Sequence, residues 1–246
     1  MIFNLFKAKP TLKELIPEGF VDIHSHLLPG IDDGAKNIEE SINIINMMKN
    51  LGYSKLIATP HIYPGLYENN RDKIKQKYTE VEKKIRGLNI DLNFAAEYLI
   101  NKSLIKEAEE RELLTIQKKY VLLEMSYLAQ PLELYETLFK IQINGYIPIL
   151  AHPERYTFLF SNFSEYYKLK KRGCQFQLNL LSTTGCYGKK ISSISERLLK
   201  EKLIDFVGSD IHNIKHANLM KTKLNISSIK QLVKAINKTQ EKFSGS

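Results

Sequence analysis

The sequence predicts an α/β fold in which parallel strands alternate with helices, most simply a barrel. Two observations lead to this prediction. Seven short runs are separated by longer amphipathic segments, and the runs are mostly apolar, as is typical of strands covered on both faces. A doubly wound open sheet has the same alternation and stays an alternative. The strand-like runs are FVDIH (20–24), KLIATP (55–60), LNFAAE (92–97), YVLLEM (120–125), IPILAH (147–152), CQFQLN (174–179) and IDFVGS (204–209).

Amphipathic segments lie between these runs and predict the helices. Apolar residues recur in them at helical spacing, and several end at glycine, a common helix stop. The predicted helices are 38–52, 71–85, 133–146, 163–173 and 195–203, with a closing helix at 227–243.

Composition indicates a globular protein without a membrane span. Of its 246 residues, 43% are apolar and 26% are charged, which is ordinary for a soluble domain. No window of 18 residues is apolar enough for a transmembrane helix, and the N-terminus lacks a signal-peptide core. We therefore expect a cytoplasmic protein. Weak contact of the first residues, MIFNLFK, with the inner face of the membrane is an alternative.

The cysteines and the charge exclude further classes. Cys174 and Cys186 are too few for a disulfide scaffold, and neither begins a C-x5-R phosphate loop, so both are expected to be structural. The net charge of +9 is spread over lysine-rich helices and favours an acidic or phosphorylated partner. No nucleic-acid-binding motif is present, and no nucleic acid is expected as a partner.

Metal-binding residue types follow the strand-like runs. Five of the six histidines lie at the C-terminal end of such a run, and His216 lies close behind the last of them. The C-terminal ends of parallel strands face one side of a barrel or sheet, so these side chains are expected to converge. The converging set is His24, His26, His61, Glu97, Glu124, His152, Asp210 and His212.

A ring of imidazoles and carboxylates predicts a metal site. Such groups are costly to bury without partners, whereas divalent cations bind both. His24 and His26 are two residues apart in a predicted strand, so they point the same way and can bind one ion. Asp22 faces the same side and is expected to orient a ligand histidine from behind. A lone histidine at a strand end is usually structural, but the placement of so many histidines and carboxylates at the same ends favours a metal site.

These motifs together resemble the PHP (polymerase and histidinol phosphatase) superfamily. The segments DIHSHLLPGIDDGAKNIEES, ATPHIYPG, AEYLI, LLEMSY, AHPERY and GSDIHN are most similar to bacterial tyrosine-protein phosphatases of capsule and exopolysaccharide clusters, the CpsB/CapC/YwqE type. The resemblance runs from about residue 20 to residue 215. It implies a distorted (β/α)7, TIM-like barrel at 20–243, preceded by an N-terminal extension at 1–19, with the metals at the C-terminal ends of the strands.

The resemblance also implies which residues hold two to three divalent ions. Manganese is the expected metal, with iron, zinc or cobalt as alternatives for a ligand set without thiolate. Only the resemblance adds Asp33; its neighbour Asp32 is expected to cap the next helix or to make a local turn bond. The implied sets are His24, His26, Glu97 and Asp210 for the first ion, Glu97, Glu124 and His152 for the second, and Asp33, His61 and His212 for the third.

Arg155, in AHPERY, resembles the phosphate-contacting arginine of the family, and its fork suits phosphate oxygens. An ion pair with Glu154 is the alternative. Relatives have a second arginine shortly after the SDxH motif; here Lys215 and His216 stand there and are candidates for phosphate contact. Three further residues are candidates either for lining the pocket or for packing in the barrel: Tyr98, Tyr127 and Tyr156.

The implied function is a metal-dependent protein-tyrosine phosphatase that uses a metal-activated hydroxide. Arg155, His152 and Asp210 are its expected catalytic residues, and its expected partner is the tyrosine-rich tail of a bacterial polysaccharide-export tyrosine kinase. Two alternatives remain. One is a PHP phosphoesterase acting on a small phosphomonoester such as histidinol phosphate, and the other is a non-catalytic metal-binding regulator.

Overall fold

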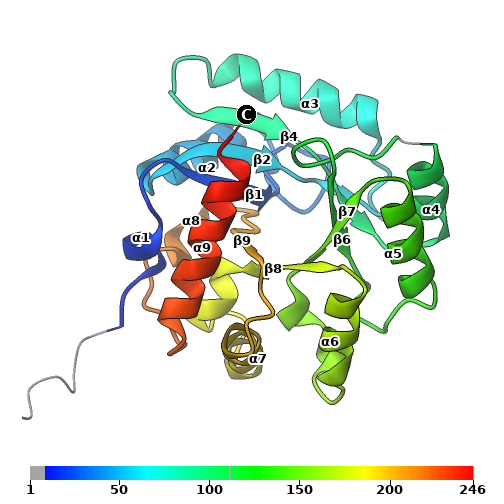
Figure 1. Ribbon diagram of the computed structural model, residues 1–246. Coiled ribbons are helices and arrows are strands. Elements are labelled where there is room, and N and C mark those ends of the chain that lie inside the picture. Colours follow the sequence, from blue (N-terminus) through cyan, green and yellow to red (C-terminus); the bar gives the residue numbers. More distant parts are fainter. Residues whose placement is uncertain (1–8, 111, 246) are drawn as a thin grey trace, which may run out of the picture.

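Parallel strands form the centre of the molecule, and helices lie outside them (Figure 1). The strands are β1 (Phe20–Ser25), β2 (Tyr53–Ala58), β3 (His61–Ile62), β4 (Asp91–Phe94), β5 (Glu97–Leu99), β6 (Tyr120–Glu124), β7 (Ile147–Ala151), β8 (Gln175–Asn179) and β9 (Phe206–Gly208). In the computed structural model, which describes residues 9–110 and 112–245, they pair as two parallel sheets. Their orders are β1-β2-β4 and β3-β5-β6-β7-β8-β9. The order never reverses along the chain, which argues against the doubly wound alternative.

Most of the predicted helices are confirmed within a few residues. The helix near 195 begins earlier than predicted, at Lys189. Its first turns contain several serines, so the apolar face there was not visible in the sequence pattern. Three short helices, α1, α4 and α8, were not predicted. The helices are α1 (Leu12–Leu15), α2 (Ile38–Asn50), α3 (Arg71–Lys84), α4 (Lys102–Glu109), α5 (Leu134–Ile143), α6 (Ser164–Lys171), α7 (Lys189–Lys200), α8 (Ile214–Leu219) and α9 (Ile229–Phe243).

The second and third predicted strands are each interrupted, which divides the strands between two sheets. The chain leaves β2 at Thr59 and Pro60 and restarts as β3; the corresponding break between β4 and β5 is at residues 95–96. Proline cannot donate a ladder hydrogen bond, so it favours such a break. His61 and Glu97 were expected at strand ends. Instead they begin β3 and β5, where they are direct register partners.

Backbone hydrogen bonds also link β1 to the residues that directly follow β9. The N–H of Asp210 donates to the carbonyl of His24 at 2.8 Å, and the N–H of His26 donates to the carbonyl of Ile211 at 2.8 Å. Ser25 and Ile211 form a parallel bridge there. The predicted α/β class with parallel strands is therefore confirmed, and the two interrupted strands are where it departs from a regular barrel.

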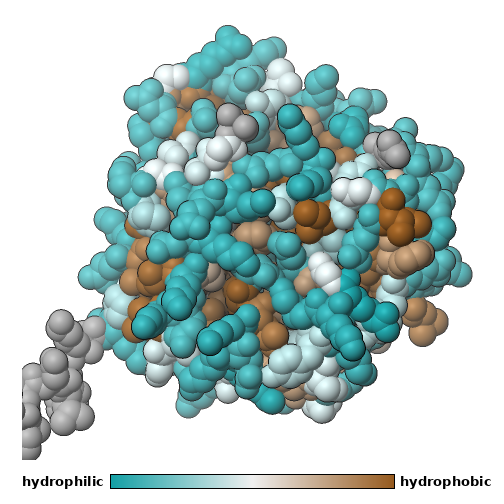
Figure 2. Space-filling model, in the orientation of Figure 1, coloured by the Kyte–Doolittle hydropathy of each residue, from teal (hydrophilic) through white to brown (hydrophobic). Residues whose placement is uncertain are grey.

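The described residues before β1, from residue 9 on, pack against the rest of the molecule. Leu12 is fully buried, and Lys13 N–H donates to the carbonyl of Met220 at 2.9 Å. Hydrophilic side chains cover most of the face in Figure 2, including α3 and α9, in line with the expected solvated helix faces. Within the described residues, none of the helices combines the length and apolar character that a membrane crossing requires.

Candidate metal centre

All nine predicted ligands meet in one cluster. They come from β1 and its following loop, from the first residues of β3 and β5, from the end of β6, and from the turns after β7 and β9. Their ligand atoms form four overlapping groups, each within 4.8 Å. The groups are His26, Asp33, His61 and His212; His24, His26 and Glu97; His24, His152 and Asp210; and His61, Glu97 and Glu124.

Glu97 lies at the centre of this cluster and is fully buried. Its Oε1 is 3.0 Å from Nε2 of His152, and its Oε2 is 3.1 Å from Nε2 of His24 and 3.2 Å from Nδ1 of His61. The two oxygens of one carboxylate thus face histidines on different sides, which is the geometry that a bridging ligand requires.

Several buried atoms in the cluster lack hydrogen-bond partners among the described residues. Nδ1 of His61 and Oε1 of Glu124 are 2.8 Å apart, yet neither is satisfied by a hydrogen bond. Nε2 of His24 faces Nε2 of His26 at 3.2 Å. Buried polar atoms are nearly always paired, and converging nitrogen and oxygen donors of this kind are what divalent cations bind. The residues therefore fit metal ions, and the absence of thiolate suits manganese, iron, zinc or cobalt.

Burial and charge together shift the pKa values of these groups. Burial opposes protonation of His61, but Glu97, Asp33 and Glu124 together outweigh it and raise the pKa of His61 to about 10. Burial likewise opposes ionisation of Glu97, but His24 and His61 hold its pKa well below the usual range. Burial and the nearby Glu97 raise the pKa of Glu124. Two close carboxylates resist joint ionisation, and a cation between them removes that penalty.

The turns after β7 and β9 hold two predicted ligands in unusual backbone conformations. His152 has a φ of 35° and Asp210 a φ of 52°, both in the left-handed region that is costly for residues with side chains. Asn179, at the end of β8, donates from Nδ2 to Oδ2 of Asp210 at 2.8 Å. Burial lowers the pKa of His152 to about 4, so its imidazole is neutral near pH 7, as metal ligation requires.

Asp32 contacts the predicted ligand His26 and does not cap a helix, so the predicted capping role is wrong. Its Oδ2 is 2.8 Å from Nδ1 of His26, and its Oδ1 accepts the N–H of Gly34 at 3.0 Å. The second contact confirms the predicted local turn bond. Asn37 caps α2 instead, with its side chain accepting the N–H of Glu40 at 2.9 Å. Asp32 therefore orients the ring of His26 from behind.

Gln177 orients His24, a role that the sequence analysis assigned to Asp22. The carboxylate of Asp22 accepts the N–H of Ser209 at 2.9 Å and also its hydroxyl, and it reaches only the backbone of His24. Oε1 of Gln177 lies 2.7 Å from Nδ1 of His24. The prediction for Asp22 was wrong because its carboxylate is hydrogen-bonded to Ser209 and does not contact the imidazole of His24.

Two glycines let the backbone approach the first strand closely. A Cβ on Gly34 would lie 2.1 Å from the carbonyl oxygen of His26, and one on Gly208 would lie 2.7 Å from Cβ of His24. Any side chain at either position would therefore displace a predicted ligand.

The cluster opens into a pocket of about 320 Å³ that Arg155 also lines. Nη1 of Arg155 is 2.8 Å from Oδ2 of Asp210, and its guanidinium lies 5.1 Å from the ring centre of Tyr127 and 4.8 Å from that of Tyr187. Burial opposes its charge, but Asp210, Tyr127 and Tyr187 together outweigh this effect and raise the pKa of Arg155. The alternative ion pair with Glu154 is wrong, because that carboxylate is buried and accepts hydrogen bonds from β8 and the segment after it.

Comparison with known proteins identifies the family. Residues 20–239 match the family model described as capsular polysaccharide synthesis, CpsB/CapC. The chain belongs to the CpsB/CapC family. It is 33% identical over 201 residues to the tyrosine-protein phosphatase YwqE of Bacillus subtilis, covering 80% of this chain and 79% of that protein. It is 30% identical over 207 residues to the putative tyrosine-protein phosphatase CapC of Staphylococcus aureus, covering 83% and 81%.

Solved structures agree with this assignment. One, from the crystal structures of YwqE from Bacillus subtilis and CpsB from Streptococcus pneumoniae, described as unique metal-dependent tyrosine phosphatases, matches with a TM-score of 0.76. That match has 30% identity and covers 92% of this chain and 88% of the other. Histidinol phosphate phosphatase from Lactococcus lactis matches with a TM-score of 0.56, 13% identity and coverage of 89% and 94%, which shows the shared fold alone.

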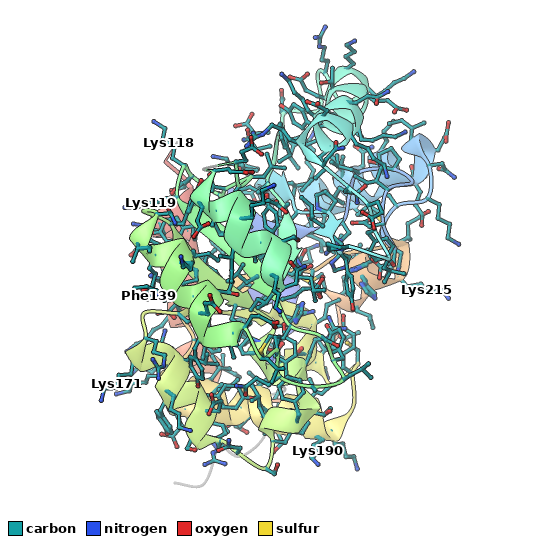
Figure 3. The ribbon with its side chains drawn as sticks, turned by 90° about the vertical axis from the view of Figure 1, so that its right-hand side faces the viewer. Lys118, Lys119, Phe139, Lys171, Lys190 and Lys215 are labelled. Atoms are coloured by element: carbon teal, nitrogen blue, oxygen red, sulfur yellow. The ribbon has the colours of Figure 1, made fainter. Side chains whose placement is uncertain are left out.

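Two candidates for phosphate contact lie outside the lining of the pocket in this CpsB/CapC chain. Lys215 is exposed on α8 and extends outward from it (Figure 3). His216 is half-buried beside His212. The backbone N–H of His212 lies 3.4 Å from Nδ1 of His216. Neither is among the residues that line the described pocket.

The three candidate tyrosines have different positions. Tyr127 lines the pocket, and its ring stacks on that of His152 with centroids 5.9 Å apart. Tyr98 and Tyr156 are buried, and their hydroxyls accept backbone N–H groups from Leu114 and Met125, so they pack in the barrel. The sequence analysis missed another wall residue, Tyr67, because its loop follows β3, which was not predicted as a strand.

Proposed function

We propose that this CpsB/CapC chain is a metal-dependent protein-tyrosine phosphatase. The observation that carries the proposal is a cluster of nine side chains with N and O donors that opens into one pocket, which the guanidinium of Arg155 also lines. When bound, two to three divalent ions, manganese foremost, would neutralise phosphate charge and activate water near neutral pH. The proposed ligands are His24, His26, Asp33, His61, Glu97, Glu124, His152, Asp210 and His212.

The proposed roles of the chain's own residues follow from their positions. Arg155 binds phosphate oxygens with its planar fork, and the rings of Tyr127 and Tyr187 hold that fork in place. Glu97 links neighbouring ligand groups. Tyrosinate is a fair leaving group because the pKa of tyrosine is about 10. A direct displacement by water needs no cysteine nucleophile, and burial raises the pKa of Cys174 to about 12.

A phosphorylated protein segment suits the pocket better than a small metabolite. Tyr127 and Leu128 line the pocket and are 43% and 91% exposed, so its mouth is open. We propose as partner the tyrosine-rich tail of a bacterial tyrosine kinase of polysaccharide export, in keeping with the family description. The proposed location is the cytoplasm, with attachment at the inner face of the membrane as an alternative.

Metal analysis and turnover measured on one purified sample test this proposal. We expect bound divalent metal and a higher kcat/KM for a phosphotyrosine peptide than for histidinol phosphate. Asp210→Asn should lose both metal and turnover, while the control Asp72→Asn, on the exposed start of α3, keeps both. A higher kcat/KM for histidinol phosphate would favour the small-molecule phosphoesterase. No turnover of any phosphoester by the metal-loaded protein would favour the non-catalytic regulator.

A further inference from the structure

The mouth of the pocket has an apolar rim made by two loops. Leu66, in the loop after β3, is 61% exposed, and Leu128, in the loop after β6, is 91% exposed. Both line the pocket that holds the predicted ligands. Single exposed leucines are ordinary on protein surfaces, but exposed apolar side chains gathered at a functional pocket mark a contact site.

Each of these leucines is next in sequence to a tyrosine of the pocket wall. Tyr67 stacks on His61, with ring centroids 5.3 Å apart and planes 10° from parallel. Tyr127 stacks in the same way on His152, at 5.9 Å and 20°. The two loops therefore repeat one arrangement, with the tyrosine against a predicted metal ligand and the leucine at the mouth.

Hydrogen bonds hold the loop of Leu66 in shape. The N–H of Tyr67 donates to the carbonyl of Tyr63 at 2.8 Å, and the reverse bond measures 3.1 Å. Gly65 supplies the left-handed residue of this turn, with a φ of 86°. Asn69 fastens the loop through its side-chain amide to the carbonyl of Ile31 at 2.8 Å. A side chain presented on such a turn loses little entropy when it contacts a ligand.

We propose that Leu66 and Leu128 select phosphotyrosine segments with an apolar or aromatic side chain close to the phosphotyrosine. The inference rests on the proposed phosphatase function and adds a substrate class to it. The phosphotyrosyl ring enters between Tyr67 and Tyr127, and the neighbouring side chains of the substrate cover the two leucines. A segment with polar neighbours leaves these leucines in water and forgoes the hydrophobic gain.

Two peptides and four variants test this selection. One peptide has leucine on both sides of the phosphotyrosine, and the other is identical except for serine there. We compare kcat/KM for both with the metal-loaded wild type, Leu66→Ser, Leu128→Ser and the double variant that carries both changes. The matched control is Leu132→Ser, which lies in the same loop as Leu128, is 98% exposed and does not line the pocket. Thermal unfolding of each variant checks that the fold is kept.

We expect the wild type to prefer the leucine peptide by about tenfold, equivalent to about 1.4 kcal/mol. Leu66→Ser and Leu128→Ser should each reduce this ratio, the double variant should bring it close to one, and Leu132→Ser should leave it unchanged. A wild-type ratio near one, or an equal loss in Leu132→Ser, overturns the role of the rim. Failure to hydrolyse either peptide overturns the phosphatase function itself.

Discussion

Replacement of Asp32 by asparagine is expected to weaken metal binding, although Asp32 is not a predicted ligand. Its carboxylate faces three donors, namely Nδ1 of His26 at 2.8 Å, the N–H of Gly34 at 3.0 Å and the N–H of His61 at 3.2 Å. Asparagine has nearly the same shape, but only one of its two terminal atoms accepts hydrogen bonds. Its NH2 group would therefore face at least one N–H, and either His26 or the turn loses its partner.

The size of the effect follows from these contacts. A hydrogen bond to a charged group contributes about 1.5–3 kcal/mol. Loss of the group behind a metal-binding histidine lowers metal affinity about 10- to 100-fold, which corresponds to about 1.4–2.7 kcal/mol. The two ranges agree, so we expect the Kd for metal to rise about 10- to 100-fold while the number of bound ions stays the same.

Calorimetric titration of Mn²⁺ into chelator-treated protein measures both quantities. Asp33→Ala, which removes a predicted ligand, should instead reduce the number of ions bound. Glu39→Gln, an exposed carboxylate in the first turn of α2, is the matched control and should behave as the wild type does. A wild-type Kd for Asp32→Asn would refute the reasoning, because it would mean that the buried contact to His26 does not support metal binding.

Three further outcomes are expected. A chelator should abolish phosphotyrosine hydrolysis while alkylation of the exposed Cys186 leaves it intact, and activity that survives complete metal removal would contradict the mechanism. Arg155→Lys should lower kcat/KM about 10- to 100-fold, because an ammonium cannot make two parallel hydrogen bonds to phosphate, whereas Arg86→Lys on the surface should have no effect in the same steady-state assay. Burial opposes the charge of Glu196, but Lys200 and backbone N–H groups before α9 lower its pKa to about 2. A depressed pKa gives stability above the unfolded value of 4.5 that is lost as the pH falls toward 2. Glu196→Gln should therefore lower the free energy of unfolding near neutral pH by about 1–3 kcal/mol and flatten its acid dependence in urea titrations, and an unchanged pH profile would disprove this role.

The convergence of the predicted ligands other than Asp33 was predictable because it depends on the strands being parallel. Parallel strands in chain order place all their C-terminal ends on one side, so a list of terminal residues approximates a site. The supporting contacts were not predictable in this way. Gln177 and His24 are 153 positions apart, and nothing local distinguishes a glutamine that faces a ligand from one that faces the core. The resemblance separated Asp33 from its neighbour Asp32, but only the folded loop shows that Asp32 lies against the ring of His26.

The roles of two residues shortly after the SDIH motif were also ambiguous in the sequence. Lys215 and His216 were candidates for phosphate contact, but they belong to α8, a helix that was not predicted. Successive residues on a helix point about 100° apart, so neighbours in sequence face different surroundings. Lys215 therefore extends into solvent while His216 packs beside His212.

Because the second predicted strand is interrupted, the site depends on the number of residues that link β2 to β3. The N–H of Thr59 donates to the carbonyl of Ser25 at 2.8 Å, so this link is fastened to β1 before β3 begins at His61. Side chains alternate between faces, so deletion or insertion of one residue here would turn His61 away from Glu97. We expect homologous chains to vary freely in the lengths of their outer loops while keeping two residues between β2 and β3, even where those two residues differ.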